Sequence, residues 1–261
     1  MNRLLIATLI VVSAASMAFL VLREGPLNAD VRTHELLTDD ITRSYRIVVP
    51  HQTSTPAAIV FAFHGTGDSP DSMAAYSRLD RVAAGNGFIL VYPTAQNSMW
   101  STINFDPANL DANPDVQFFD ALLAHVASIH DIDRDRVYLT GMSNGGSFVQ
   151  LLAVARATQI AALVAHSGLR PKELNRCDAT MPIMLIVGAD DSVAPIMESD
   201  AEQYRTFGHS VEYVRVPRLA HEWSTHHNVD MWRFLSDHVR HVEEAEQSDG
   251  RGAADSAFPN G

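Results

Sequence analysis

A serine in a glycine-rich pentapeptide is the residue of this chain best suited to nucleophilic chemistry. Residues 141–145 read Gly-Met-Ser-Asn-Gly, which matches the pattern Gly-x-Ser-x-Gly with Ser143 at its centre. An apolar run, Val137–Thr140, precedes the pentapeptide, and a helical pattern follows it to about Ala157. A tight turn from strand to helix exposes a serine hydroxyl, and flanking glycines let neighbouring backbone approach it. We therefore predict that Ser143 is a nucleophile, with a glycine-rich helix start as the alternative interpretation.

Two adjacent carboxylates offer an acid for the same chemistry. A serine hydroxyl needs a base to remove its proton, and the base needs a carboxylate to orient it. The strand predicted at Ile183–Val187 is followed almost directly by Asp190 and Asp191. We favour Asp191, which precedes Ser-Val-Ala-Pro, and Asp190 stays open as the alternative. A turn that both carboxylates merely cap is the interpretation without chemistry.

The base is sought among twelve histidines. His221 lies between the last predicted strand, Val211–Val216, and the last predicted helix. That position gives the chain order serine, acid, histidine, which is one of the known orders for such a triad. His226 and His227 lie close by, and with His221 they suggest a metal site. Because no second group of ligands has zinc-like spacing, we predict no metal and assign His221 as the base.

A loop after an early strand is expected to help bind a developing oxyanion. His64-Gly65-Thr66 follows the apolar run Ala57–Phe63. A backbone N–H from such a loop, and one from the residue after the nucleophile, are the usual donors. We predict that Thr66 and Asn144 supply them. His64 precedes the nucleophile in the chain, so we expect it to hold the loop rather than act as the base.

Strands and helices must bring these residues together, and the apolar patterns of the sequence predict where those elements lie. The predicted strands are residues 45–49, 57–63, 88–92, 137–140, 162–165, 183–187 and 211–216, and the predicted helices are residues 73–84, 116–129, 145–157, 201–207 and 229–242. Such alternation predicts an α/β fold with a mostly parallel central sheet and helices on both faces. Residues 94–114 are rich in Asn, Asp, Pro and Ser, and they predict a long functional loop at the pocket.

Composition narrows the class of function. The chain has 261 residues, 46% hydrophobic and 19% charged, which is ordinary for a globular protein. Its formal net charge of −12 disfavours nucleic acid as a partner. The single cysteine, Cys177, excludes an intramolecular disulfide and a cysteine zinc site, and we expect it to be a loop thiol.

The ends of the chain differ from its middle. After Arg3, nineteen uncharged residues run from Leu4 to Leu22, which predicts an export signal. The length of this run favours an uncleaved membrane anchor over a cleaved signal peptide, and both place the domain outside the cytoplasm. We divide the chain into a signal or anchor at residues 1–24, a polar linker at 25–41, a catalytic domain at 42–242 and a disordered acidic tail at 243–261.

Together these blocks resemble a known family of the α/β-hydrolase superfamily. The resemblance rests on His64-Gly65, Asp115-Val116 with Phe118, the block from Asp133 through Arg136 to Gly146, Gly188-x-x-Asp191-x-x-x-Pro195, and His221-x-Trp223. This set is similar to the LpqC-like esterases, of the poly(3-hydroxybutyrate) depolymerase and feruloyl esterase type. The likeness spans about residues 42–240.

The resemblance implies an α/β-hydrolase fold, cleavage of carboxylic esters through a serine triad, and no cofactor. It implies that Ser143, Asp191 and His221 carry the triad, with polyester, feruloyl or acetyl esters as substrates. Trp100 and Trp223 are candidates for the substrate pocket, with core packing as the alternative for each. An acyltransferase with the same triad and a non-catalytic binding protein on this fold are the alternative functions.

Overall fold

The computed structural model describes residues 25–174 and 179–240. Three predictions fall outside these ranges: the export segment, the loop thiol Cys177 and the acidic tail. Within the described ranges, no helix is both long enough and apolar enough to cross a membrane.

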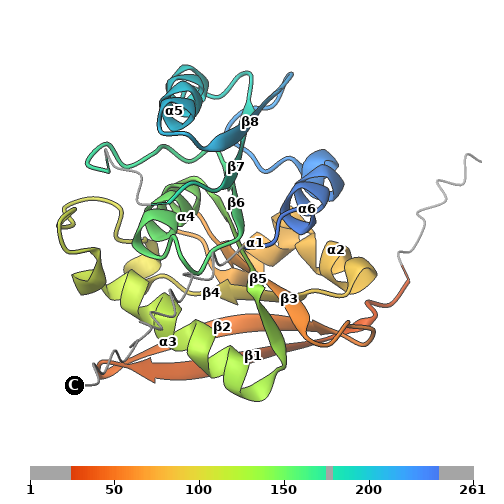
Figure 1. The fold of residues 1–261 in the computed structure, drawn as a ribbon. Coiled ribbons are helices and arrows are strands. Elements are labelled where there is room, and N and C mark those ends of the chain that lie inside the picture. Colours follow the sequence, from red (N-terminus) through yellow and green to blue (C-terminus); the bar gives the residue numbers. More distant parts are fainter. Residues whose placement is uncertain (1–24, 175–178, 241–261) are drawn as a thin grey trace, which may run out of the picture.

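An eight-stranded sheet forms the centre of the molecule, in the order β1-β2-β4-β3-β5-β6-β7-β8 (Figure 1). The strands are β1 (Ala29–Thr38), β2 (Ile41–Pro50), β3 (Ala57–Phe63), β4 (Ile89–Pro93), β5 (Ile132–Met142), β6 (Ala162–His166), β7 (Pro182–Gly188) and β8 (Ser210–Val216). Strand β2 pairs antiparallel with β1 and β4, whereas the strands from β4 to β8 pair in parallel. The carboxyl ends of these parallel strands therefore meet at one edge of the sheet.

Within residues 25–174 and 179–240, six α-helices cover the two faces of the sheet, which confirms the predicted layers (Figure 1). They are α1 (Pro70–Ser77), α2 (Leu79–Asn86), α3 (Pro114–Ile129), α4 (Asn144–Ala155), α5 (Ala194–Thr206) and α6 (Asn228–Ser236). Apolar residues of α3, α4 and α5 join one core cluster, and those of α1, α2 and α6 join the other. All seven residues of β3 are buried between the two clusters, as its unbroken apolar sequence predicts.

The structure corrects the prediction that residues 25–41 form a linker. Residues 29–38 form β1, the edge strand, paired along its full length with β2. No residue of β1 is fully buried, so its sequence lacks the apolar signal that marks the inner strands.

The helix predicted at residues 73–84 is also two helices. Arg78 adopts a left-handed conformation, with φ of 56°, and ends α1 by donating its backbone N–H to Ala74 O. Ser69 caps the start of α1 one turn earlier than predicted, because its side chain accepts the Ser72 N–H.

Candidate active site

Ser143 lies in a strained turn between β5 and α4. Its backbone has φ of 54° and ψ of −119°, outside the regions that ordinary residues favour. The turn is held by the Ser143 N–H, which donates to His166 O at 2.8 Å. A Cβ on Gly141 would stand 2.4 Å from Gly145 O, and one on Gly145 would stand 2.1 Å from Phe63 O. The two glycines of the pentapeptide are therefore required by close backbone packing, as the sequence pattern predicts.

Ser143, His221 and Asp191 form a continuous row of hydrogen bonds. His221 Nε2 lies 2.9 Å from Ser143 Oγ, and His221 Nδ1 lies 2.8 Å from Asp191 Oδ2. An ionised carboxylate only accepts hydrogen bonds, so Nδ1 carries the proton and Nε2 is free to accept the serine proton. The three residues come from turns after β5, β8 and β7, and the structure brings them together as predicted.

Asp191 is buried beside His221, whereas Asp190 is exposed. The Asp191 side chain is only 1% exposed, and its Oδ1 accepts the Val193 N–H at 3.1 Å. Burial alone would raise the pKa of Asp191. Hydrogen bonds from Val193 and His221 outweigh that effect, so its pKa lies below the ordinary value. Asp191 is thus held as a carboxylate, the form that orients and stabilises a charged imidazole.

The loop after β3 carries Thr66, the residue predicted as one oxyanion donor, to the pocket of Ser143. Thr66 lines the same pocket as Ser143. Asn144 is the first residue of α4, so its N–H has no acceptor within the helix. Among the described residues, neither the Thr66 N–H nor the Asn144 N–H donates a hydrogen bond to protein. Both peptide groups are therefore available to an external oxygen.

His64 has the structural role that the sequence predicts. Its Nε2 accepts the Ala95 N–H at 3.1 Å, so Nδ1 carries the proton and donates to Gly65 O at 2.8 Å. Burial lowers the pKa of His64 below 6.5, which keeps the ring neutral. Both nitrogens are thus occupied: Nδ1 within the loop after β3, and Nε2 in joining that loop to the segment after β4.

The loop at residues 94–114 supports the site from behind instead of lining its pocket, contrary to prediction. Trp100 is fully buried, and its Nε1–H donates to His64 O at 2.9 Å. The backbone of Trp100 meets the Asn144 side chain, whose Oδ1 accepts the Trp100 N–H at 2.7 Å. Gly67 N–H donates to Ser98 O of the same loop at 2.8 Å. Trp100 is therefore a core residue that contacts both the loop after β3 and the start of α4. Its predicted place in the substrate pocket is wrong.

The pocket in front of Ser143 has a volume of about 520 Å³ and is open to solvent. Its walls are formed by Gly65, Thr66, Asp68, Tyr76, Met142, Ser143, His221, Glu222 and Trp223. Trp223 is in the wall, as predicted, while Asp68, Tyr76 and Glu222 were not anticipated. Tyr76 belongs to no motif, Glu222 is the variable residue of His221-x-Trp223, and Asp68 lies two residues after Thr66. Burial, and then the nearby Asp68 carboxylate, raises the pKa of Tyr76, so its phenol remains neutral.

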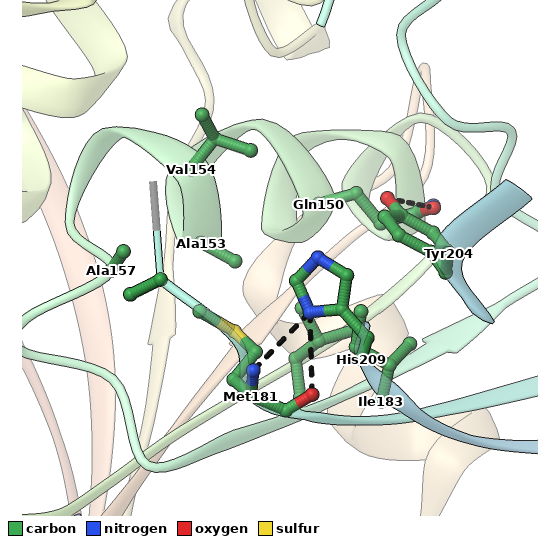
Figure 2. Close-up of a pocket in the computed structure, with 10 residues that line it drawn as sticks. Gln150, Ala153, Val154, Ala157, Met181, Ile183, Tyr204 and His209 are labelled. Atoms are coloured by element: carbon green, nitrogen blue, oxygen red, sulfur yellow. Dashed lines mark hydrogen bonds between the residues drawn. The ribbon is translucent and has the colours of Figure 1, made fainter. Parts of the chain in front are cut away.

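A second hollow lies beside α4, between this helix and the strands β6 and β7 (Figure 2). It is mostly apolar and measures only about 10 Å³, too small to hold a substrate. Figure 2 shows the Tyr204 hydroxyl directed at Gln150, whose Oε1 it reaches at 2.9 Å. Gln150 Nε2 in turn donates to Gly146 O and Gly168 O, both at 2.8 Å. This hollow therefore belongs to the packing that fixes the start of α4.

His226 and His227, considered above as metal ligands together with His221, do not lie in a cluster of ligands in the part of the chain that the structure describes. His227 Nδ1 lies 2.7 Å from Ser224 Oγ, and His226 is exposed. Within the described ranges, no three His, Cys, Asp or Glu side chains are grouped as metal ligands. The metal alternative thus gains no support from this geometry.

Comparison with known proteins identifies the family. Residues 43–212 match the family model described as esterase PHB depolymerase. The chain belongs to this family. It is 34% identical over 124 residues to a feruloyl esterase B of Neurospora crassa, a match covering 46% of this chain and 42% of that protein. It is 27% identical over 180 residues to a putative esterase of Nocardia uniformis, covering 66% and 52% respectively. The chain therefore spans about half the length of these curated relatives.

Solved structures confirm the α/β-hydrolase fold. The feruloyl esterase module from Clostridium thermocellum, complexed with sinapinate, superposes with a TM-score of 0.64 at 16% identity, covering 80% of this chain and 88% of that one. An S-formylglutathione hydrolase from Staphylococcus aureus superposes with a TM-score of 0.67 at 12% identity, covering 79% and 99%. At such low identities the likeness establishes the fold, as predicted from sequence.

Proposed function

We propose that this protein is a serine esterase that hydrolyses carboxylic esters through an acyl-enzyme on Ser143. One observation carries the proposal: Ser143, His221 and Asp191 form an aligned hydrogen-bonded row whose serine faces an open pocket. Such a row converts a weakly nucleophilic hydroxyl into an effective one. Membership of an esterase family supports the same reaction.

The geometry suggests how each group would act. His221 Nε2 takes the Ser143 proton as Oγ attacks the ester carbonyl, and Asp191 stabilises the resulting imidazolium. The Thr66 and Asn144 peptide N–H groups stabilise the oxyanion. His221 then gives its proton to the departing alkoxide, which leaves as the alcohol. A water molecule, deprotonated by His221, finally attacks the acyl-enzyme, and His221 returns that proton to Ser143 Oγ as the acid leaves.

The substrate is proposed to be a polyhydroxyalkanoate, feruloyl or acetyl ester. The description of the matching family model, esterase PHB depolymerase, supports the polyester. Two curated relatives support the feruloyl and acetyl esters by name: the feruloyl esterase B of Neurospora crassa, and a bifunctional acetylxylan esterase/xylanase of Neocallimastix patriciarum, which is 24% identical over 151 residues. The latter match covers 58% of this chain and 22% of that protein. The open pocket admits water, which favours hydrolysis over acyl transfer to an alcohol.

A panel of esters tests the proposal and sorts its alternatives. Nitrophenyl acyl esters, methyl ferulate, acetylated xylan and hydroxybutyrate oligomers would be assayed with the wild type and with Ser143→Ala. Loss of the nucleophile is expected to lower kcat on the order of 10⁶-fold. A variant that keeps more than about a hundredth of the wild-type rate would refute the role of Ser143. A transferase would need an added alcohol for turnover, and a binding protein would not react with a fluorophosphonate probe.

We also propose that the esterase works outside the cytoplasm, tethered by the apolar segment Leu4–Leu22. That segment lies outside the described residues, so the proposal rests on its sequence: a short basic flank followed by nineteen uncharged residues. A tether would keep the domain near the cell envelope.

A further inference from the structure

A buried histidine that the proposed mechanism does not use lies directly behind the pocket. His166, the last residue of β6, is only 1% exposed. Neither of its ring nitrogens has a hydrogen-bond partner among the described residues. A buried polar atom without a partner costs about 1–3 kcal/mol, so the ring is not there for its hydrogen bonds. Its role must lie in what its flat faces and its backbone contact.

One face of the ring stacks on Trp223. The two ring centroids are 3.7 Å apart and the planes differ by 17°. Trp223 lines the pocket and follows His221 by two residues in the chain. Its indole N–H donates to Asn228 Oδ1 at 2.8 Å, and Asn228 Nδ2 donates to Ser77 O at 2.7 Å. Trp223 is therefore held at its edge by Asn228 and across its face by His166.

The backbone of His166 contacts Ser143, the residue that His221 is proposed to deprotonate. Its carbonyl oxygen accepts the Ser143 N–H at 2.8 Å and so helps to maintain the strained turn. Two residues later, the Gly168 backbone packs against Gly146, where a Cβ on Gly168 would come within 2.6 Å of Gly146 Cα. His166 thus lies between the turn that carries the serine and the loop that carries the histidine.

Before the histidine, the loop of His221 is held by the Asp190 N–H, which donates to Leu219 O at 2.9 Å, and His221 itself is held by Asp191. His221 and Glu222 are exposed, and the Glu222 N–H bonds only locally, to Ala220 O at 2.9 Å. Trp223 is the first buried side chain after His221, so its position limits where the imidazole can lie. A shift of about 1 Å in a reacting group is enough to lower a rate by about 100-fold.

We propose that His166 is a positioning residue for the esterase reaction: its ring is the flat support on which Trp223, and through it His221, is aligned with Ser143. This inference rests on the proposed function. It assigns His166 no contact with substrate, and it depends on the ring as a planar surface and not on its nitrogens.

The test compares His166→Ala and His166→Phe with a matched control. Phe88 is also buried and stacks on Trp232, with centroids 4.0 Å apart and planes 23° apart. It precedes β4, at the sheet edge opposite the active site, so Phe88→Ala removes an equivalent aromatic stack far from Ser143. All variants would be assayed well below their melting temperatures, for kcat, KM and the rate at which a small fluorophosphonate labels Ser143.

We expect His166→Ala to lower kcat and the labelling rate about 10- to 100-fold, and Phe88→Ala to lower neither by more than about twofold. His166→Phe keeps the planar ring and should retain kcat within about threefold. If His166→Ala does not fold, His166→Leu fills the space without a planar ring and should also be slow.

Three results would overturn the inference: His166→Ala no slower than Phe88→Ala, His166→Phe as slow as His166→Ala, or His166→Leu at the wild-type rate. A wild type that hydrolyses no ester would instead refute the proposed function, so the two failures are distinguishable.

Discussion

Asp191 and Asp190 are neighbours in the chain that face different surroundings. Asp191 is buried and hydrogen-bonded to His221 and Val193, whereas Asp190 is exposed to solvent. Asp191→Asn should place an amide beside His221 Nδ1 and favour the wrong imidazole tautomer, an effect of about 10⁴ in kcat for comparable triads. Asp190→Asn is the matched control and should change kcat by less than about threefold. Steady-state kinetics of both variants show which carboxylate orients His221. If Asp190→Asn is the slower variant, Asp190 is the acid of the triad.

His166 should also make folding stability depend on pH. Burial, with a smaller effect from His227, lowers its pKa from 6.5 to about 3. Between these values the unfolded chain binds a proton that the folded chain excludes. The contribution of His166 to the free energy of unfolding is therefore fully present above about pH 6.5. It falls as the pH decreases towards 3, by about 1.4 kcal/mol per pH unit.

His166→Phe removes this titration and keeps the ring. Urea unfolding at pH 7 and pH 5 should show the wild type losing about 2 kcal/mol more than the variant over that interval. Equal losses in the two proteins would mean that His166 is protonated in the folded state.

Residues whose chemistry follows from a motif could be anticipated, and residues defined by packing could not. Ser143, Asp191 and His221 each follow a predicted strand, so the shared edge of a parallel sheet brings them together. Trp100 is a large aromatic residue in a polar loop, which is typical of a pocket residue. Only the three-dimensional path of the loop shows that Trp100 is buried. His166 belongs to no motif, and its stacking on Trp223 joins residues far apart in the sequence.

At the scale of elements, the loops after β3 and β8 place two carboxylates at the pocket. Asp68 and Glu222 line it, and no Lys or Arg of the described part of the chain does so. Asp68 lies close to Ser143: Asp68 Oδ2 and Ser143 Cβ stand 3.2 and 3.5 Å from the point where a Cβ on Gly65 would be. An acyl group that ends in a carboxylate would meet both negative charges, whereas an uncharged acyl group would not.

We therefore expect nitrophenyl butyrate to be hydrolysed faster than the mono-nitrophenyl ester of succinate. At roughly 7 Å near the surface, each carboxylate should contribute about two- to fivefold to this ratio of kcat/KM values. Asp68→Asn and Glu222→Gln should each reduce the ratio, as should added salt. Glu212→Gln removes an exposed charge from β8 and should leave it unchanged. A ratio that neither pocket variant alters would contradict the expectation.

The elements themselves were predictable where burial is complete. Strands such as β3 and β7 are nearly unbroken apolar runs, and their flanking turns mark where they end. The edge strand β1 was missed because its residues are largely exposed and polar. The break between α1 and α2 was missed because a single left-handed residue, Arg78, leaves the apolar pattern on both sides intact.

At the scale of the whole molecule, the described part of the chain forms an eight-stranded sheet with helices on both faces. The carbonyl of Gly25 accepts a hydrogen bond from Arg81 at 3.0 Å, and Asn28 Oδ1 lies 3.0 Å from His51 Nδ1. These contacts tie the first described residues to the domain. A shortened chain beginning at Gly25 therefore retains every described contact of the domain, and we expect it to keep full activity.

The proposed tether can be tested by comparing that shortened chain with the full one. Leu4–Leu22 is about as long as the spanning segments of membrane proteins, and Arg3 with the amino terminus favours a cytoplasmic start. We expect the full chain to sediment with membranes and to resist extraction by salt and carbonate, because apolar burial is insensitive to both. The shortened chain should remain in the supernatant with an unchanged kcat. Mature protein found free in the medium, with an amino terminus near Phe19, would show instead that the segment is a cleaved signal.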